Sequence, residues 1–297
     1  MHVKSTDRWP WIDPVDPGVY KKRKSWPRIS IVTPSYNQAD FLENTILSVI
    51  NQNYPNLEFI VVDGGSTDGS VDIIRKYEQH LDYWVSEKDS GQSDAINKGF
   101  AKATGDFLGW LNSDDFFTPL ALYHMAKDDW PEDVGAKVGI AYRINLKGKI
   151  IKTPKIPNLT FQGLLRWSGY SSFLQPGCFF TKNAWKLAGP LSEELHYCMD
   201  LELWLKIVQK LKFVKLNEEM AYAYAHDSAK TTADIEKMRV EIALVVTEFG
   251  GREVGRKVLY KMIDDLIEIK KGRFKVFYLF VRIVRKIEKI LGISKGH

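Results

Sequence analysis

The fold class is decided by the stretch Ile29-Ser30-Ile31-Val32-Thr33-Pro34-Ser35-Tyr36-Asn37, a short run rich in β-branched residues that ends in polar ones. The segment 29–33 is typical of a strand buried on both faces. Outward from it, 57–62, 83–86 and 107–111 are also expected to be strands, and 40–51, 71–79 and 94–103 have helical spacing. Strands and helices therefore alternate four times within about 90 residues, which predicts an α/β fold with a doubly wound, mostly parallel sheet flanked by helices.

The pattern becomes looser after residue 120 and helical after residue 233. We expect a hairpin from 137–145 and 149–153, strands at 177–181, 213–216 and 220–225, and helices at 183–188 and 199–209. The first residues are rich in proline and charge and are expected to form an extended arm. The sequence thus predicts an arm over 1–27, a main domain over 28–232 and a helical C-terminal region over 233–297.

Positive charge is concentrated near the end of the chain. The net charge of the 297 residues is +5, but residues 270–297 alone hold nine Lys or Arg and a single Glu. A nucleic-acid-binding protein more often carries basic charge over its folded body, so we expect no nucleic-acid partner. Cys178 and Cys198 are too few for a disulfide framework or a structural zinc site, and they suit a reducing compartment. We expect neither a signal peptide nor a membrane-spanning helix.

The basic C-terminal segment has the pattern of an amphipathic helix. Its apolar residues recur at helical intervals, namely Phe277, Phe280, Val281, Val284, Ile287 and Leu291, and its Lys and Arg lie mostly elsewhere on the helix. This pattern is typical of an interfacial membrane anchor. Packing of the same helix against the body or a partner chain remains the alternative. The prediction is a cytoplasmic protein held peripherally on the inner face of the cell membrane.

Polar clusters follow three of the predicted strands. They are Pro34-Ser35-Tyr36-Asn37, the Gly-rich segment 63–70, and Asn112-Ser113-Asp114-Asp115. Ligands of open parallel sheets bind beyond the carboxyl ends of the strands. Adjacent carboxylates repel unless a cation neutralises them, and carboxylate oxygens suit Mg²⁺ or Mn²⁺. The alternatives are that Asp115 merely caps a following helix and that 63–70 is an ordinary turn. The chain has neither a Gly-x-Gly-x-x-Gly fingerprint nor a Walker A loop, which disfavours dinucleotide-binding and P-loop proteins.

Four segments occur together in a characteristic order and spacing. They are Ile31-Val32-Thr33-Pro34-Ser35-Tyr36-Asn37, Val62-Asp63-Gly64-Gly65-Ser66-Thr67-Asp68-Gly69-Ser70, Asp94-Ala95-Ile96-Asn97-Lys98-Gly99 and Leu111-Asn112-Ser113-Asp114-Asp115. In this arrangement the chain resembles the family 2 glycosyltransferases, which are inverting enzymes of the GT-A fold that use nucleotide-sugar donors. The resemblance extends more loosely through 175–180 and 199–204 to His226, and so covers about 28–232.

The resemblance implies a role for each matching position. Binding of the donor is implied for Pro34, Tyr36, Asn37, Asp63, Asp94, Asn97, Asp114 and Lys230. A divalent cation, Mn²⁺ or Mg²⁺, is implied at Asp115, Asp114 and His226. Asp200 matches the catalytic base, which accepts the proton of the acceptor hydroxyl. The alternative for Asp200 is a helix N-cap.

Some positions depart from the family pattern or have a second interpretation. Gly64 stands where many members have a second aspartate, which removes a common contact to the base, and Asn112 replaces the first acid of the usual metal motif. Trp167, Tyr170 and Phe173 either line an acceptor loop or belong to the core. His196 is a weaker candidate for a metal ligand than His226.

The expected function is inverting, metal-dependent transfer of a sugar, most simply from a UDP-sugar, to a hydroxyl of a glycan acceptor. The acceptor is expected to be polyprenyl-linked, as in the synthesis of cell-surface polysaccharides. Two other classes remain open: a sugar-phosphate nucleotidyltransferase and a catalytically silent membrane-associated adaptor.

Overall fold

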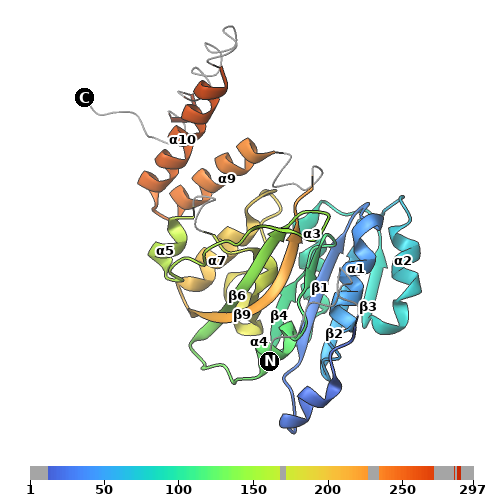
Figure 1. Ribbon diagram of the computed structural model, residues 1–297. Coiled ribbons are helices and arrows are strands. Elements are labelled where there is room, and N and C mark those ends of the chain that lie inside the picture. The colour runs from blue at the N-terminus through green and yellow to red at the C-terminus, as the bar shows by residue number, and fades with distance from the viewer. Residues whose placement is uncertain (1–12, 168–171, 227–233, 271–283, 285, 289–297) are drawn as a thin grey trace.

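The computed structural model describes residues 13–167, 172–226, 234–270, 284 and 286–288 (Figure 1). These residues form a nine-stranded mixed sheet in the order β3-β2-β1-β4-β8-β6-β9-β5, with β7 paired to β6. The strands are β1 Ile29–Ser35, β2 Leu57–Asp63, β3 Tyr83–Ser86, β4 Phe107–Trp110, β5 Asp115–Phe117, β6 Val134–Ile144, β7 Ile150–Lys152, β8 Cys178–Thr181 and β9 Lys212–Tyr224. Strands β1 to β4 are mutually parallel, whereas β8 runs antiparallel to β4 and to β6.

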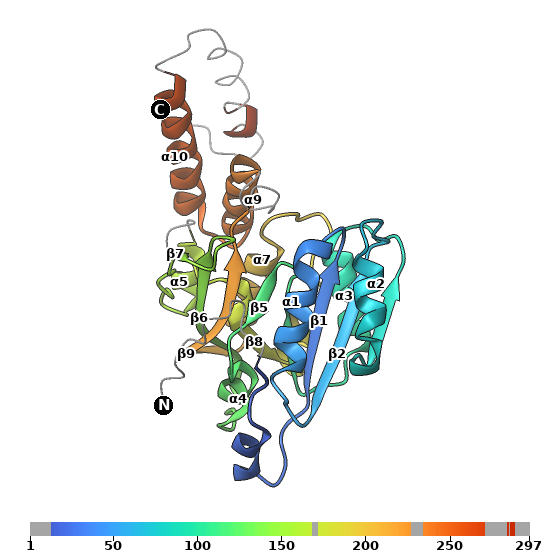
Figure 2. The ribbon, with the colours of Figure 1, turned by 45° about the vertical axis from the view of Figure 1, so that its right-hand side comes forward.

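Helices cover both faces of this sheet. They are α1 Ala39–Ile50, α2 Ser70–Lys76, α3 Gln92–Lys102, α4 Ala121–Ala126, α5 Phe161–Leu165, α6 Lys182–Ala188, α7 Met199–Val208, α9 Ile235–Glu248 and α10 Arg252–Lys270, with 3-10 helices η1 Pro17–Lys22, η2 Glu78–His80 and η3 Gln175–Gly177. Alternate residues of β1 enter different cores, because successive side chains of a strand point to opposite faces. Ile29 and Ile31 pack in a cluster with α1, α2 and α4, while Val32 packs in a cluster with α3, α6 and α7. Figure 2 shows α1 and α2 in front of β1 and β2.

The predicted fold class is confirmed, two local predictions are wrong, and one alternative is excluded. The segments 213–216 and 220–225 are parts of one continuous strand, β9. Asp115 begins the short strand β5 and does not cap a helix. The N-terminal arm is not extended throughout, because residues 17–22 form η1 and Tyr20 is buried. The phenolic O–H of Tyr20 donates to the carbonyl of Gln52 at 2.7 Å, which fixes this segment to the body.

The C-terminal helices belong to the same folded body as the sheet. Ile242, Val245 and Val246 of α9 are buried in one hydrophobic cluster with Trp204 and Phe180. Helices α9 and α10 lie beyond one end of the sheet (Figures 1 and 2). The domain boundary at 232 therefore stays a prediction, and most of the basic segment 271–297 lies outside the described residues. Within the described part of the chain, no helix is long and apolar enough to cross a membrane.

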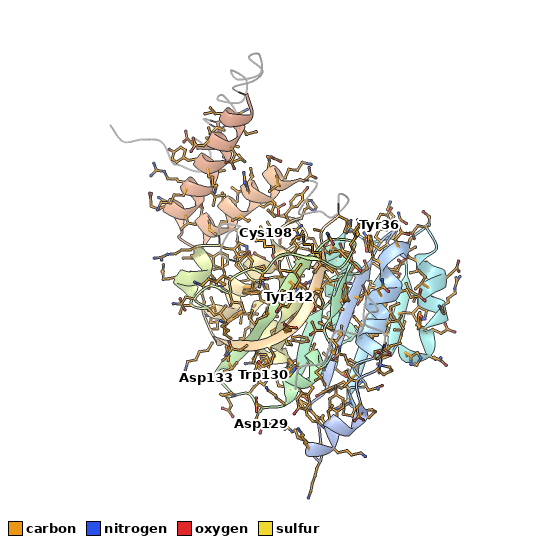
Figure 3. The ribbon with its side chains drawn as sticks, in the orientation of Figure 1. Tyr36, Asp129, Trp130, Asp133, Tyr142 and Cys198 are labelled. Atoms are coloured by element: carbon orange, nitrogen blue, oxygen red, sulfur yellow. The ribbon has the colours of Figure 1, made fainter. Side chains whose placement is uncertain are left out.

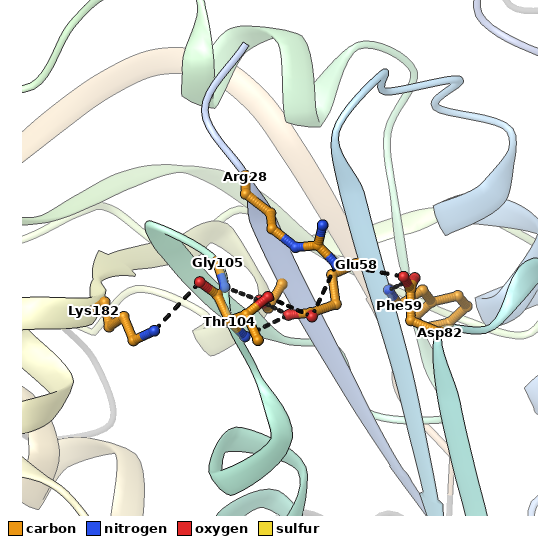
Figure 4. Close-up of polar contacts among 8 residues, drawn as sticks. Arg28, Glu58, Phe59, Asp82, Thr104, Gly105 and Lys182 are labelled. Atoms are coloured by element: carbon orange, nitrogen blue, oxygen red, sulfur yellow. Dashed lines mark hydrogen bonds and ion pairs between the residues drawn. The ribbon is translucent and has the colours of Figure 1, made fainter.

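A polar cluster ties β1 and β2 together at the end of the sheet where these strands begin (Figure 4). The buried carboxylate of Glu58 accepts hydrogen bonds from the hydroxyl of Ser30, from the backbone N–H and hydroxyl of Thr104 at 2.7 Å each, and from Arg28 at 3.0 Å. These donors outweigh the cost of burial and lower the pKa of Glu58 to about 2. The cluster holds an ionised glutamate inside the protein.

Candidate active site

A cavity of about 1420 Å³ lies where β1, β2 and β4 end. Pro34 near the end of β1, Tyr36 after it, Gly64 after β2 and the segment 112–115 after β4 all line it. The three polar clusters that the sequence places at strand ends therefore meet at one cavity, as expected for parallel strands. Tyr36 is 60% exposed, so its ring is available for stacking against a ligand. In Figure 3, Tyr36 and Cys198 lie toward the same end of the sheet, far from Asp129 and Asp133.

The acidic pair after β4 is held rigidly although its charges repel. The hydroxyl of Thr45 on α1 donates to the backbone carbonyls of Ser113 and Asp115 at 2.9 and 2.7 Å, which fixes the loop. Asp115 is buried and accepts a hydrogen bond from the side-chain amide of Asn112 at 3.0 Å. Burial, and secondly the charge of Asp114, raise the pKa of Asp115 well above its ordinary value. A bound cation would reverse this, because it favours the ionised form.

His226 meets Asp114 across a separation of 112 residues. Its Nε2 atom lies 3.0 Å from Oδ2 of Asp114, and its ring stacks on Phe41 with the centroids 4.7 Å apart. Within the described ranges, no three His, Cys, Asp or Glu side chains converge as a metal cluster. Mg²⁺ is commonly held by one or two carboxylates together with substrate phosphates. The buried Asp115 carboxyl and the neighbouring Asp114 fit that mode of binding, with His226 beside them.

Asp200 lines the same cavity from the second position of α7. Cys198 precedes the helix and occupies the N-cap position, so Asp200 does not cap the helix. The Oδ1 atom of Asp200 accepts a hydrogen bond from the backbone N–H of Leu201 at 2.7 Å. Desolvation dominates over this bond and raises the pKa of Asp200 to about 6. A carboxylate with such a pKa is ionised at neutral pH and is a stronger proton acceptor than an exposed aspartate.

Glu241 of α9 anchors the segment that leads into Asp200. Its carboxylate accepts the backbone N–H groups of His196 at 3.0 Å, Tyr197 at 2.7 Å and Cys198 at 3.3 Å. The position of the base therefore depends on a helix that follows it by about 40 residues in the chain. No local motif marks Glu241 in the sequence, so its role is not predictable from the sequence alone.

Two of the predicted donor-binding residues have their polar groups occupied by the protein itself. Asp63 is fully buried and accepts hydrogen bonds from the N–H groups of Gly65 and Ser66 and from the hydroxyls of Ser66 and Ser86. The amide of Asn97 exchanges two hydrogen bonds with the backbone of Leu191, each 2.9 Å long. Their side chains shape the loops around the cavity and are not among those that line it.

The other predicted residues differ in how close they come to the cavity. Asp94 accepts from the N–H of Ser90 at 2.8 Å and pairs with Lys98 at 3.2 Å. Asn37 accepts from the N–H of Thr67 at 2.9 Å, which joins the loops after β1 and β2. Neither Asp94 nor Asn37 is among the lining residues, whereas Pro34, Tyr36 and Asp114 are. Lys230 lies outside the described residues.

Three of the remaining aromatic and histidine candidates border the cavity, and one lies outside the described residues. Trp167 and Phe173 are buried in the main hydrophobic cluster, where their rings meet edge to face at 5.1 Å, and both also border the cavity. Tyr170 lies outside the described residues. His196 borders the cavity as well. Its backbone N–H, and not its ring, donates to the carboxylate of Glu241.

The structure also brings to the cavity charged residues that no sequence motif marks. Asp89 fills the space beside Gly64, where a Cβ atom would lie 2.7 Å from its Oδ2 atom. Arg143 of β6 and Lys152 of β7 line the cavity, and the charge of Arg143 acts to lower the pKa of Asp115. These residues lie outside the four family segments, and only the sheet topology places them at the site.

Comparison with known proteins gives one family and several relatives. The family model for "Glycosyl transferase family 2" matches residues 30–184. The chain is 43% identical over 94 residues to the putative teichuronic acid biosynthesis glycosyltransferase TuaG of Bacillus subtilis, a stretch that covers 30% of this chain and 36% of TuaG. It is 26% identical over 252 residues to a chondroitin synthase of Pasteurella multocida, which covers 84% of this chain and 26% of that protein. The match thus spans only about a third or less of these relatives.

Solved structures share the fold. TarS 1–349 of Staphylococcus aureus in complex with UDP-GlcNAc superposes with a TM-score of 0.59 at 17% identity, over 84% of this chain and 76% of that one. The mannosyltransferase PcManGT of Pyrobaculum calidifontis in complex with GDP-Man and Mn²⁺ gives a TM-score of 0.56 at 16% identity, over 96% of this chain and 84% of that one.

Proposed function

Because this chain belongs to glycosyl transferase family 2, we propose that it transfers a sugar from a nucleoside-diphosphate donor to a hydroxyl of a glycan acceptor, with inversion. The observation that carries the proposal is one cavity that holds an acidic pair, Asp114 and Asp115, together with the partly buried Asp200. An acidic pair that can hold a cation, together with a separate acid that can serve as a base, suits glycosyl transfer. Nucleotidyl transfer needs a Gly-rich basic signature after the first strand, where this chain has Pro34-Ser35-Tyr36-Asn37. The catalytically silent adaptor is disfavoured because it has no need for Asp114, Asp115 and Asp200 on the lining of one cavity.

The donor nucleotide would bind at the ends of β1 and β2. Tyr36 offers an exposed ring to the base, and Asp89 offers a carboxylate beside Gly64. Asp63 and Asn97 would support this pocket by holding its loops, and Asn37 and Asp94 would do the same. Solved relatives bound to UDP-GlcNAc and GDP-Man support a nucleotide sugar as donor. A UDP-sugar is our first candidate.

A divalent cation would be held by Asp114 and Asp115, with His226 next to them. When bound, Mn²⁺ or Mg²⁺ stabilises the negative charge that develops on the leaving diphosphate. The complex of PcManGT with Mn²⁺ supports this assignment. The protein prepares the site by holding the carboxyl of Asp115 buried and partly compensated by Asn112.

Asp200 would act as the base in a single displacement. The acceptor hydroxyl attacks the anomeric carbon, the bond from that carbon to the diphosphate oxygen breaks, and the hydroxyl proton passes to the carboxylate of Asp200. The nucleoside diphosphate leaves with the electron pair. Attack from the side opposite to the leaving group inverts the anomeric configuration.

The donor can be identified by release of nucleoside diphosphate from a panel of UDP-, GDP- and TDP-sugars. Calorimetry with the free nucleoside diphosphates, with and without Mn²⁺, tests the metal site independently of turnover. We expect binding of one nucleotide to be strengthened by Mn²⁺ and this gain to disappear in Asp115→Ala. Equal affinity with and without the ion would refute the metal assignment.

The acceptor and the location of the protein complete the proposal. We infer a polyprenyl-linked glycan as acceptor and attachment to the inner face of the cell membrane through the basic segment after residue 270. Each basic residue near anionic lipid contributes roughly 1 kcal/mol, so such a segment would bind reversibly. Co-sedimentation with anionic liposomes should retain the full chain and lose a chain truncated after residue 270. Equal sedimentation of both chains would disprove membrane attachment by this segment.

A further inference from the structure

The cavity has a second wall, made by the two C-terminal helices. Helices α9 and α10 contribute three basic side chains and a set of apolar ones to the lining. These are Arg239, Lys257 and Lys261, and Ile235, Met238, Ile242, Val254 and Val258. All of them follow the segment 30–184 that matches the family model. The four sequence segments shared with the family all precede these helices, so they assign no role to this wall.

The cavity is lined by basic and acidic side chains, and its basic residues Lys88, Arg143, Lys152 and Arg166 come from elements other than α9 and α10. Its acidic lining residues are Asp89, Asp114, Asp115 and Asp200, and none of them comes from α9 or α10. The charged residues that α9 and α10 place in the lining are all basic. Arg239 is paired with Asp265 at 2.7 Å, which clamps α10 onto α9 and fixes the wall. Because Asp265 neutralises Arg239, the net positive charge of this wall comes from Lys257 and Lys261, next to its apolar residues.

The position of Asp200 identifies the occupant. In a single displacement the attacking hydroxyl and the leaving diphosphate lie on opposite sides of the anomeric carbon. With the diphosphate at Asp114 and Asp115, the acceptor hydroxyl lies at Asp200, and the rest of the acceptor extends from there. Glu241 ties α9 directly to the segment that precedes Asp200, so α9 and α10 are the wall next to the acceptor.

We infer that Lys257 and Lys261 form a subsite for an anionic group of the acceptor, a phosphate or a carboxylate close to the sugar that receives the new residue. This inference rests on the proposed function and specifies its acceptor class. Two lysines four residues apart on one helix face can approach the same anion. Charge complementarity in a partly enclosed cavity favours an anionic acceptor over a neutral one of the same size. The neighbouring apolar residues fit the start of a lipid chain or the faces of sugar rings.

Direct binding tests the subsite without relying on turnover. The full chain, with UDP and Mn²⁺ in excess to fill the donor side, is titrated in a calorimeter with geranyl diphosphate, with a tetrasaccharide that contains glucuronate, and with a neutral tetrasaccharide of N-acetylglucosamine. The test variant is Lys257→Ala with Lys261→Ala. The control variant is Lys210→Ala with Arg252→Ala, which removes the same charge from exposed positions outside the cavity lining.

At least one anionic probe should bind, and its affinity should fall by about tenfold or more in the test variant and stay unchanged in the control variant. Binding of geranyl diphosphate indicates a lipid-diphosphate acceptor, and binding of the glucuronate probe indicates an acidic glycan. The inference is overturned if the neutral probe binds as well as both anionic ones, or if the test variant binds like the wild type. If the chain binds no nucleotide and turns over no donor, the proposed function is wrong. The comparison of variants with the anionic probes still tests the subsite in that case.

Discussion

At the scale of single residues, Asp200 carries the sharpest prediction about catalysis. Asp200→Asn should lower kcat by about 10²–10⁴-fold, because the amide cannot accept the hydroxyl proton, and should leave nucleotide affinity unchanged. The control is Glu202→Gln on the same helix, which pairs with Lys206 at 2.9 Å and lies outside the cavity lining. Near-normal turnover of Asp200→Asn would show that another group is the base.

The raised pKa of Asp200 also sets the pH dependence. With the pKa at about 6, kcat/KM should fall tenfold per pH unit below 6 and level off above it. The free energy of unfolding changes with pH in the opposite direction to kcat/KM. The folded protein binds the proton of Asp200 more tightly than the unfolded chain does, so a rise in pH destabilises the fold. The stability cost grows as pH rises from about 4 through 6, so Asp200→Asn should be more stable than wild type at pH 8, by up to about 3 kcal/mol. Denaturant titrations at pH 5 and pH 8 measure it.

Gly64 and Asp89 form a pair whose substitutions should compensate. Gly64→Asp introduces a side chain where Asp89 already lies, at 2.7 Å from the new Cβ atom, and should raise the donor KM by about tenfold through repulsion and displacement. Asp89→Gly in the same chain should restore the donor KM. If the donor KM of the double variant is higher than that of either single variant, Asp89 does not replace the carboxylate that many family members carry at the position of Gly64.

At the scale of elements, α9 is expected to act as a positioning helix. Glu241→Gln loses the charge that three backbone N–H groups share, so the segment before α7 should loosen. The expected result is a kcat about tenfold lower with unchanged nucleotide affinity, and a shifted midpoint of the pH profile. Glu248→Gln, exposed on the same helix, should match wild type. An unchanged pH midpoint would assign Glu241 a purely structural role.

The same elements show what the sequence could and could not predict. Strands β1, β2, β3 and β4 were predictable because they are short apolar runs between helices of clear period. Strand β9 was divided in two because polar residues at 217–219 interrupt its apolar pattern, and long-range pairing with β6 overrides that local signal. Asp114 and Asp200 were found through family motifs. Asp89, Arg143 and Glu241 were not, since their roles arise only from contacts between distant segments.

At the scale of the whole molecule, the Glu58 cluster predicts how acid unfolds the protein. The pKa of Glu58 is lowered from 4.5 to about 2, so the stability that its ionised form contributes is complete above about pH 4.5 and is lost as the pH falls toward 2. Glu58→Gln should be less stable than wild type by about 2–3 kcal/mol at pH 7, with a difference that shrinks below pH 4.5. Urea unfolding across this range measures it. A difference independent of pH would show that packing, and not charge, makes Glu58 important.

The separation between the two walls of the cavity has a consequence for how such enzymes diversify. Tyr36, Asp89, Asp114 and Asp115, on the proposed nucleotide side, lie within the segment that matches the family model, whereas Lys257 and Lys261 come from a helix that follows it. We therefore expect substitutions on α10 to change the acceptor polymer that the enzyme uses while the donor sugar stays the same. An exchange of residues 252–270 between two homologues should transfer the acceptor preference and leave the donor preference unchanged.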